Sequence, residues 1–177
     1  RRDFTINAMA YNDDERLVDA FGGMRDLNYH LIRCVGDPKE RFSEDALRIL
    51  RAVRFSAQLA FPIEPETAEA IKSLAPNLEK ISAERIQTEL TKLITSDHPE
   101  RILDAWELGI TAIVLPEFDV MMKTPQHTMY HKYDVGRHTV AVMQNIEADP
   151  VLRWAALLHD SAKPMCRTTD ENGTDHF

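Results

Sequence analysis

The sequence has little cysteine, no long apolar run and no initiating methionine. Its 177 residues include two cysteines, Cys34 and Cys166, which are too few for a disulfide framework and favour a reducing, cytoplasmic setting. No stretch approaches the ~18–20 consecutive apolar residues of a membrane span, so a transmembrane protein is excluded. No basic stretch followed by an apolar one opens the chain, so no secretory signal is visible. The start at Arg1 leads us to expect a piece of a longer protein.

The net charge of −8 is unevenly distributed along the chain. Taken as a whole, an acidic balance argues against a nucleic-acid binder. Residues 30–60, however, carry six basic and four acidic side chains, whereas residues 61–130 carry six basic and twelve acidic ones. Because exposed charges act over only ~8–10 Å, the local balance decides whether a polyphosphate binds. We therefore expect a nucleotide to bind at residues 30–60.

Helix signals dominate the chain from Asp37 onward. Before that point the pattern is mixed, and we expect a short helix at 4–11 and strands at 17–21 and 31–35. Capping residues followed by apolar stripes predict a mainly α remainder. The expected helices begin at residue 37 and then cover 43–59, 65–74, 83–94, 99–108, 135–146 and 150–162. Residues 121–134 show no period and predict a loop.

One carboxylate and three arginines recur at every third position within the expected helix 43–59. They are Asp45, Arg48, Arg51 and Arg54. Three residues advance about 300° around a helix, so these side chains are expected to follow a slowly turning stripe on one side. A carboxylate accepts from an exocyclic base amine, and guanidiniums donate to ring acceptors and phosphates. The alternative is an ion pair between Asp45 and Arg48 on a solvated face, worth ~0.2–0.5 kcal/mol.

Several ordered motifs resemble those of the class II tRNA nucleotidyltransferase and poly(A) polymerase family. The run Arg1-Arg2-Asp3-Phe4-Thr5-Ile6-Asn7-Ala8 resembles its RRDxTxNA element, and residues 19–38 resemble the next element. The run Glu44-Asp45-Ala46-Leu47-Arg48 resembles its EDxxR element. The likeness continues through residues 81–86 and covers essentially the whole chain.

This resemblance implies an enzyme that adds C and A nucleotides from CTP and ATP to the 3′ end of tRNA. By the family pattern, Asp45 and Arg48 read the incoming base, and Arg51 and Arg54 help to hold the nucleotide. Arg2 grips it from the other side of the cleft. Relatives that add only A, only CC, or poly(A) tails share these motifs, so the choice among these activities stays open.

The family's metal-binding carboxylates lie in a GxDxD-type element upstream of the RRD element, and no matching Asp-x-Asp is present here. The resemblance implies Mg²⁺ in the full enzyme, so we assign no catalytic residue in this chain. We expect the chain to be an inactive internal fragment of a longer enzyme. In a fragment without the remainder of the nucleotidyltransferase head domain, apolar side chains of the N-terminal part are expected to be exposed. They are Phe4, Ile6, Leu17, Val18 and Ile32.

Histidines near the C-terminus form a second constellation. Residues 152–164 contain Leu157-Leu158-His159-Asp160 followed by Lys163-Pro164, and this run resembles the start of an HD phosphohydrolase domain. Some bacterial members of the family carry such a domain after the helical neck. With His138 from an earlier helix, His159 and Asp160 could hold a divalent transition metal. The alternative is that His159 and Asp160 serve only packing or capping, and His127, His131 and His176 are expected to be surface loop residues.

Together these patterns predict a mainly α fold in three parts. Residues 1–36 are expected to be the remnant of an α/β nucleotidyltransferase head, 37–120 a helical neck of RNA-binding type, and 121–177 the start of an all-α HD domain. The expected partners are the tRNA 3′ end, CTP and ATP, with no membrane partner. Two other classes stay open, an HD-type metal-dependent phosphohydrolase and a non-catalytic tRNA-binding module.

Overall fold

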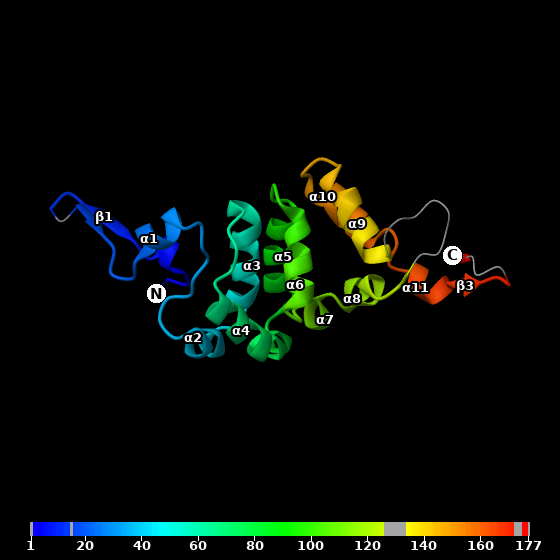
Figure 1. Ribbon diagram of the computed structural model, residues 1–177, viewed down its shortest axis with the longest axis horizontal. Coiled ribbons are helices and arrows are strands. Elements are labelled where there is room, and N and C mark those ends of the chain that lie inside the picture. The colour runs from blue at the N-terminus through cyan, green and yellow to red at the C-terminus, as the bar shows by residue number, and fades with distance from the viewer. Residues whose placement is uncertain (1, 15, 126–133, 172–174, 177) are drawn as a thin grey trace.

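The computed structural model describes residues 2–14, 16–125, 134–171 and 175–176. The chain is elongated, and its N-terminal and C-terminal segments lie toward opposite ends of the long axis (Figure 1). Among the described residues, no helix is both long enough and apolar enough to cross a membrane. The mainly α fold class is confirmed, because helices make up most of the described chain and the strands are few and short.

The helices and strands follow one another in this order. The N-terminal part contains η1 (Thr5–Asn7), β1 (Ala10–Asn12), β2 (Arg16–Val18) and α1 (Gly23–Asn28). The middle contains α2 (Pro38–Glu44), α3 (Leu47–Leu59), α4 (Pro65–Leu74), η2 (Ala75–Lys80), α5 (Ala83–Ile94), η3 (Pro99–Arg101), α6 (Ile102–Glu107), α7 (Thr111–Val114) and α8 (Pro116–Met122). The C-terminal part contains α9 (Val135–Gln144), α10 (Pro150–Leu158), α11 (Lys163–Cys166), β3 (Thr168–Thr169) and β4 (Asp175–His176).

The N-terminal segment is only partly as expected. The helix predicted at 4–11 is wrong, since only the 3₁₀ turn η1 forms there and the chain then pairs as an antiparallel hairpin of β1 and β2. The strand predicted at 17–21 ends early, at Val18. The next residue, Asp19, accepts hydrogen bonds from the backbone N–H groups of Gly23 and Met24 at 2.7 and 2.9 Å. These bonds cap α1 and so end the strand.

The predicted strand 31–35 is reduced to two isolated bridges. Ile32 pairs with Ile63 in parallel, and Cys34 pairs with Phe4 in antiparallel fashion. Phe4 and Ile32 are fully buried, so the expectation that both would be exposed is wrong, whereas Leu17 in the hairpin is exposed. The two bridges place these side chains against apolar residues of the middle helices. Phe4 and Ile32 are therefore buried without contacts from a larger sheet.

The helix predicted at 43–59 is interrupted near its start. Helix α2 ends at Glu44, and Asp45 has an extended backbone with φ −150° and ψ 103°. The Asp45 carboxylate accepts from the backbone N–H of Leu47 at 3.1 Å. Asp and Asn side chains compete with helix formation in this way, because they bond to nearby backbone donors. Asp45 therefore lies between α2 and α3, directly before the N-cap residue Ala46, and not within a helix.

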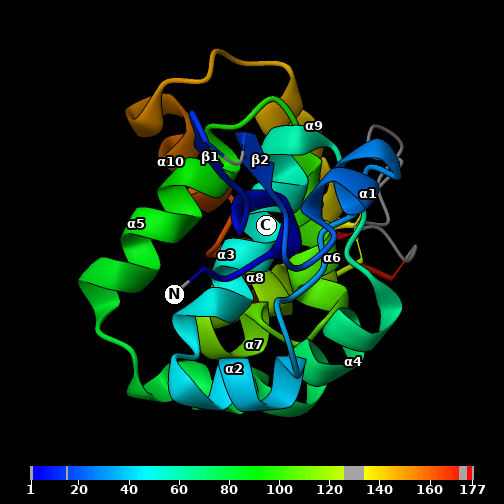
Figure 2. The ribbon, with the colours of Figure 1, turned by 90° about the vertical axis from the view of Figure 1, so that its left-hand side faces the viewer.

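Helix α3 lies at the centre of the core and packs along α5, while α2 packs on α4. End-on, the segment near the N-terminus crosses in front of α3 with α5 beside it (Figure 2). A single apolar cluster extends from Phe4 through Ile49 and Leu93 to Leu157. Because this cluster runs across residues 36 and 120, the division of the chain at those points stays a prediction.

The C-terminal helices are held to the middle of the chain by two polar side chains of α10. The buried guanidinium of Arg153 donates to the carbonyl oxygens of Ile94, Ile146 and Glu147 at 3.0–3.1 Å. The indole N–H of Trp154 donates to the hydroxyl of Thr91 at 2.9 Å. Because Ile94 and Thr91 belong to α5, these bonds attach α10 to that helix.

Candidate nucleotide and metal sites

Asp45 lies at the junction of α2 and α3 and not on the arginine-bearing face of α3, so its expected place on the helical stripe is wrong. Its second carboxylate oxygen accepts from the Nη2 of Arg85 in α5 at 2.9 Å. The alternative ion pair between Asp45 and Arg48 does not form, because Arg48 pairs with Asp3 and Glu44. One oxygen of Asp45 is therefore oriented by a backbone donor at the start of α3, and the other by a side chain of α5.

Arg48 is anchored to the N-terminal segment and to α2. Its Nε donates to Asp3 at 2.9 Å, and its Nη1 donates to the Glu44 carboxylate at 3.0 Å and to the Arg41 carbonyl at 2.6 Å. Burial by itself would lower the pKa of this guanidinium, but hydrogen bonds to the Asp3 and Glu44 carboxylates raise it above its ordinary value. Arg48 is therefore a permanently charged group in a fixed orientation.

Arg51 shares the Asp3 carboxylate with Arg48. Its Nη2 lies 2.7 Å from the second oxygen of Asp3, so one carboxylate bridges two arginines one helical turn apart. The Arg51 side chain keeps 36% of its surface exposed. Asp3 was not among the predicted site residues, although it is the third residue of the RRD run that carried the family resemblance.

Arg54 is directed away from Asp3 and toward α5. Its Nε lies 2.7 Å from the Glu89 carboxylate, and its guanidinium carbon lies 3.9 Å from the centre of the Phe55 ring. The side chain is only 11% exposed, and this burial lowers its pKa. The contact of Arg54 with a nucleotide stays a prediction. Its ion pair with Glu89 also connects α3 to α5.

Arg2 is exposed, directly before the buried residues Asp3 and Phe4. The carbonyl oxygen of Arg2 accepts from Nη2 of Arg41 at 2.8 Å, and Arg41 also pairs with Glu44. Arg41 was not predicted to belong to the site, although it lies in the positive segment 30–60. It ties the RRD segment to α2, next to the Arg48 side chain.

A surface hollow of about 550 Å³ opens beside Asp45. It is lined by Ser43, Glu44, Asp45, Ala46, Asn77, Lys80, Ile81 and Arg85. Its volume falls within the range of small-ligand sites, about 300–1,000 Å³. The hollow combines two carboxylates with two cations, so it offers both acceptors and donors to a polar ligand.

The three residues of the predicted metal site lie together at one end of α9 and α10. One donor atom from each of His138, His159 and Asp160 lies within 4.8 Å of the others. The Nε2 of His159 is 3.2 Å and the Nε2 of His138 is 3.9 Å from the same oxygen of Asp160. This oxygen is buried and accepts no hydrogen bond, although the Lys163 ammonium lies 2.8 Å away.

The orientation of His159 suits a metal ligand. Its Nδ1 is 2.7 Å from the carbonyl oxygen of Ala156, which can only accept, so this nitrogen carries the proton. The lone pair of the neutral ring is then on Nε2, the atom that faces Asp160. Metal-binding histidines are commonly oriented by such a bond to a backbone carbonyl.

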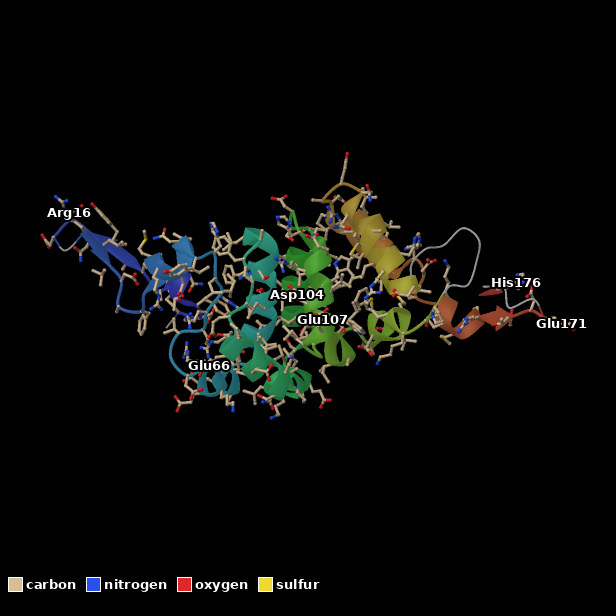
Figure 3. All side chains as sticks on the ribbon, viewed as in Figure 1. Arg16, Glu66, Asp104, Glu107, Glu171 and His176 are labelled. Atoms are coloured by element: carbon tan, nitrogen blue, oxygen red, sulfur yellow. The ribbon has the colours of Figure 1, made fainter. Side chains whose placement is uncertain are left out.

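The other histidines lie apart from this group. His127 and His131, predicted in a loop, lie outside the described residues. His176 pairs with Asp170 at 3.2 Å and is exposed, as expected, but it lies in the short strand β4 and not in a loop. It lies with Glu171 at the C-terminal end of the molecule (Figure 3).

Two family models match the chain. The family described as "Poly A polymerase head domain" matches residues 1–33. The family described as "Probable RNA and SrmB- binding site of polymerase A" matches residues 60–122. The first match covers Asp3 and the second covers Arg85 and Glu89, so each contains residues that contact the α2–α3 junction or the arginines of α3.

Similar curated proteins are longer than this chain. A protein named CCA-adding enzyme from Levilactobacillus brevis is 44% identical over 158 residues, which is 89% of this chain and 37% of that protein. A Multifunctional CCA protein from Pseudomonas fluorescens is 36% identical over 187 residues, covering 100% of this chain and 44% of that protein. The chain thus spans about two fifths of these relatives.

Solved structures agree with this similarity. The Bacillus stearothermophilus CCA-adding enzyme in complex with CTP matches 93% of this chain and 40% of its own chain, with a TM-score of 0.72 and 31% identity. The Thermotoga maritima CCA-adding enzyme complexed with tRNA matches 97% of this chain and 41% of its own, with a TM-score of 0.67 and 28% identity.

Proposed function

Since this chain belongs to the family of CCA-adding enzymes and poly(A) polymerases, we propose that its parent protein adds C and A nucleotides to the 3′ end of tRNA. The observation that carries this proposal is the α2–α3 junction, where Asp45 lines a surface hollow and where Arg48 and Arg51, which lie outside the lining of that hollow, are held by Asp3. A carboxylate and fixed guanidiniums are the groups that recognise a base edge and a triphosphate.

The chemistry of Asp45 explains a preference for C and A. Cytosine and adenine present an exocyclic amine, whereas uracil and guanine present a carbonyl at the corresponding position. A carboxylate can only accept, so it pairs with the amine and repels the carbonyl. We assign base reading to Asp45 and Arg48, and contacts with the rest of the nucleotide to Arg51, Arg54 and Arg2.

The arginines of α3 are prepared for anion binding. Asp3 orients both Arg48 and Arg51, and of the two side chains that of Arg51 keeps the larger exposed fraction, 36% against 13%. A guanidinium in a fixed orientation loses little side-chain entropy on binding, which favours affinity. Arg51, the more exposed of the two, is the one that we assign to the phosphates.

The Mg²⁺ ions expected for nucleotidyl transfer do not fit the acidic side chains of this region. Asp3 is engaged by two arginines, Glu44 by Arg41 and Arg48, and Glu89 by Arg54. A cation would have to displace these guanidiniums. We therefore assign no Mg²⁺ ligand among the described residues and derive no reaction step through this metal.

The proposal is tested by incubating the full-length parent protein with CTP or ATP alone and tRNAs ending before, within or after CCA. Addition of C to the tRNA without CCA, addition of A to the tRNA ending in CC, and no addition to complete tRNA are expected. Repeated addition of A regardless of the 3′ end would favour the poly(A) alternative, and addition of only A or only CC would identify the corresponding relative. This chain on its own is expected to extend none of these tRNAs.

A second candidate function rests on the group of His138, His159 and Asp160. We propose that this group holds a divalent transition metal, because the tautomer of His159 and the buried oxygen of Asp160 suit a ligand set of imidazoles and a carboxylate. The metal would have to displace the Lys163 ammonium, which lies 2.8 Å from that oxygen. A metal bound there supplies a Lewis acid for phosphoester hydrolysis.

The metal content of the chain, purified without chelator, tests this second function. His159→Ala is expected to lose most of the metal, whereas the exposed His176→Ala is expected to retain it. Equal metal content in the wild type and His159→Ala would remove the hypothesis and leave packing or capping as the role of this pair.

A further inference from the structure

Asp45 is held from two sides by groups that lie far apart in the sequence. One oxygen accepts from the backbone N–H of Leu47 at 3.1 Å, and the other accepts from Nη2 of Arg85 at 2.9 Å. Asp45 and Arg85 both line the hollow described above, and both side chains are partly exposed. Arg85 is therefore the one side chain of α5 that reaches the expected base-reading carboxylate.

The position of Arg85 is itself fixed by the packing of α5 on α3. Arg85 and Glu89 are four residues apart, so they lie on the same face of α5. Glu89 is buried and pairs with Arg54 of α3 at 2.7 Å. This pair turns the Arg85 face of α5 toward the α2–α3 junction and brings the Arg85 guanidinium within hydrogen-bond distance of Asp45.

The direction of the Asp45 carboxylate depends on such a side-chain contact, because Asp45 does not belong to a helix. Its extended backbone places it between α2 and α3, where no regular helical neighbours restrict its side chain. The terminal torsion of an Asp side chain is soft, so the two contacts decide the direction of the carboxylate. About four lone-pair sites exist on a carboxylate, and the two contacts leave the remaining ones for a ligand.

We propose that Arg85 is a positioning residue that orients Asp45 for base selection. Arg85 holds the carboxylate so that its remaining lone pairs are presented to an exocyclic amine, and the amine-bearing bases are thereby preferred over those with a carbonyl. The inference rests on the proposed function, in which Asp45 reads the incoming base. Without Arg85 the carboxylate rotates, and the distinction between cytosine and uracil weakens.

The experiment compares CTP and UTP in the full-length parent protein, with a tRNA lacking CCA as acceptor. In Arg85→Gln the ratio of kcat/KM for CTP to that for UTP is expected to fall about tenfold, a typical size for the coupling of contacting residues. Arg85→Lys, which keeps the charge but loses the fork, is expected to retain part of the ratio. Lys72→Gln, an equal loss of charge on exposed α4, is the matched control and is expected to leave the ratio unchanged.

A double-mutant cycle separates positioning from a merely structural role. If Arg85 acts through Asp45, Arg85→Gln is expected to cause no further loss of selection in an Asp45→Asn background. An unchanged CTP to UTP ratio in Arg85→Gln, or additive losses in the double variant, would overturn the proposal. A wild-type protein that adds no C to this tRNA would instead overturn the proposed function, and with it the role of Arg85.

Discussion

A buried arginine helps to hold α10 against α5, and its removal should destabilise the chain measurably. Arg153 is 5% exposed and satisfies three carbonyl oxygens. In Arg153→Met the side chain stays long and apolar, but the three acceptors lose their donor. The buried bond to Ile94 is worth ~1–3 kcal/mol and the two part-buried bonds are worth ~0.5–1.5 kcal/mol each. Because the variant no longer buries a guanidinium, the net loss is expected to be about 2–3 kcal/mol.

Urea unfolding followed by tryptophan fluorescence measures this loss directly, because Trp154 is adjacent to Arg153 and bonds to Thr91. Arg137→Met is the control, since Arg137 lies on the exposed side of α9 and its replacement should change stability by less than about 0.5 kcal/mol. A loss below about 0.5 kcal/mol in Arg153→Met would refute the reasoning, because the Ile94 carbonyl would then have found another donor.

Three further predictions concern other parts of the chain. Burial raises the pKa of the Cys34 thiol to about 11. At pH 8 a thiol reagent should therefore modify the exposed Cys166 and leave Cys34 unmodified until the protein unfolds. Mass spectrometry of the digested protein measures the modification of both cysteines. Gly136→Ala should lower the free energy of unfolding by ~1–3 kcal/mol in urea titrations, because the added methyl would clash with the side chain of Met122. Asp45→Ala in the full-length protein should reduce discrimination between CTP and UTP about tenfold or more while triphosphate contacts persist; equal discrimination in kcat/KM would contradict the base-reading role.

The helices that the sequence predicted best are those with a clear cap and one apolar stripe. Helices α4 and α5 have the predicted bounds, because proline at the first position and serine before the first turn mark their starts. Their apolar faces are packed in the core, so tertiary structure and local preference agree there.

The α2–α3 junction was mispredicted because a local side-chain bond decided it. An acidic residue in the first turn normally favours a helix, yet Asp45 bonds to the N–H of Leu47 and separates two helices. The pattern of every third residue grouped these four side chains on one helical stripe, which is not the geometry that the structure gives them. Periodicity describes positions along one regular helix, and it carries no information on where that helix is interrupted.

The partners of the arginines could not be predicted from spacing. Asp3 is 45 residues from Arg48, and Glu89 belongs to another helix from Arg54. Such pairs depend on how the N-terminal segment and α5 pack against α3. The motif resemblance showed that Asp3, Arg85 and Glu89 lie in or near family elements. Only the three-dimensional arrangement identified the residue with which each of them forms an ion pair.

The apolar cluster that joins Phe4 to Leu157 determines which backbone amides exchange their hydrogens together with solvent. Segments that share one core exchange their backbone hydrogens together, so the amides of α3, α5 and α10 should be protected as one cooperative unit. The exposed hairpin of β1 and β2 lies outside that cluster and should exchange by local fraying. Arg48 and Arg51 belong to α3 and therefore lie within this protected unit, although the chain is elongated.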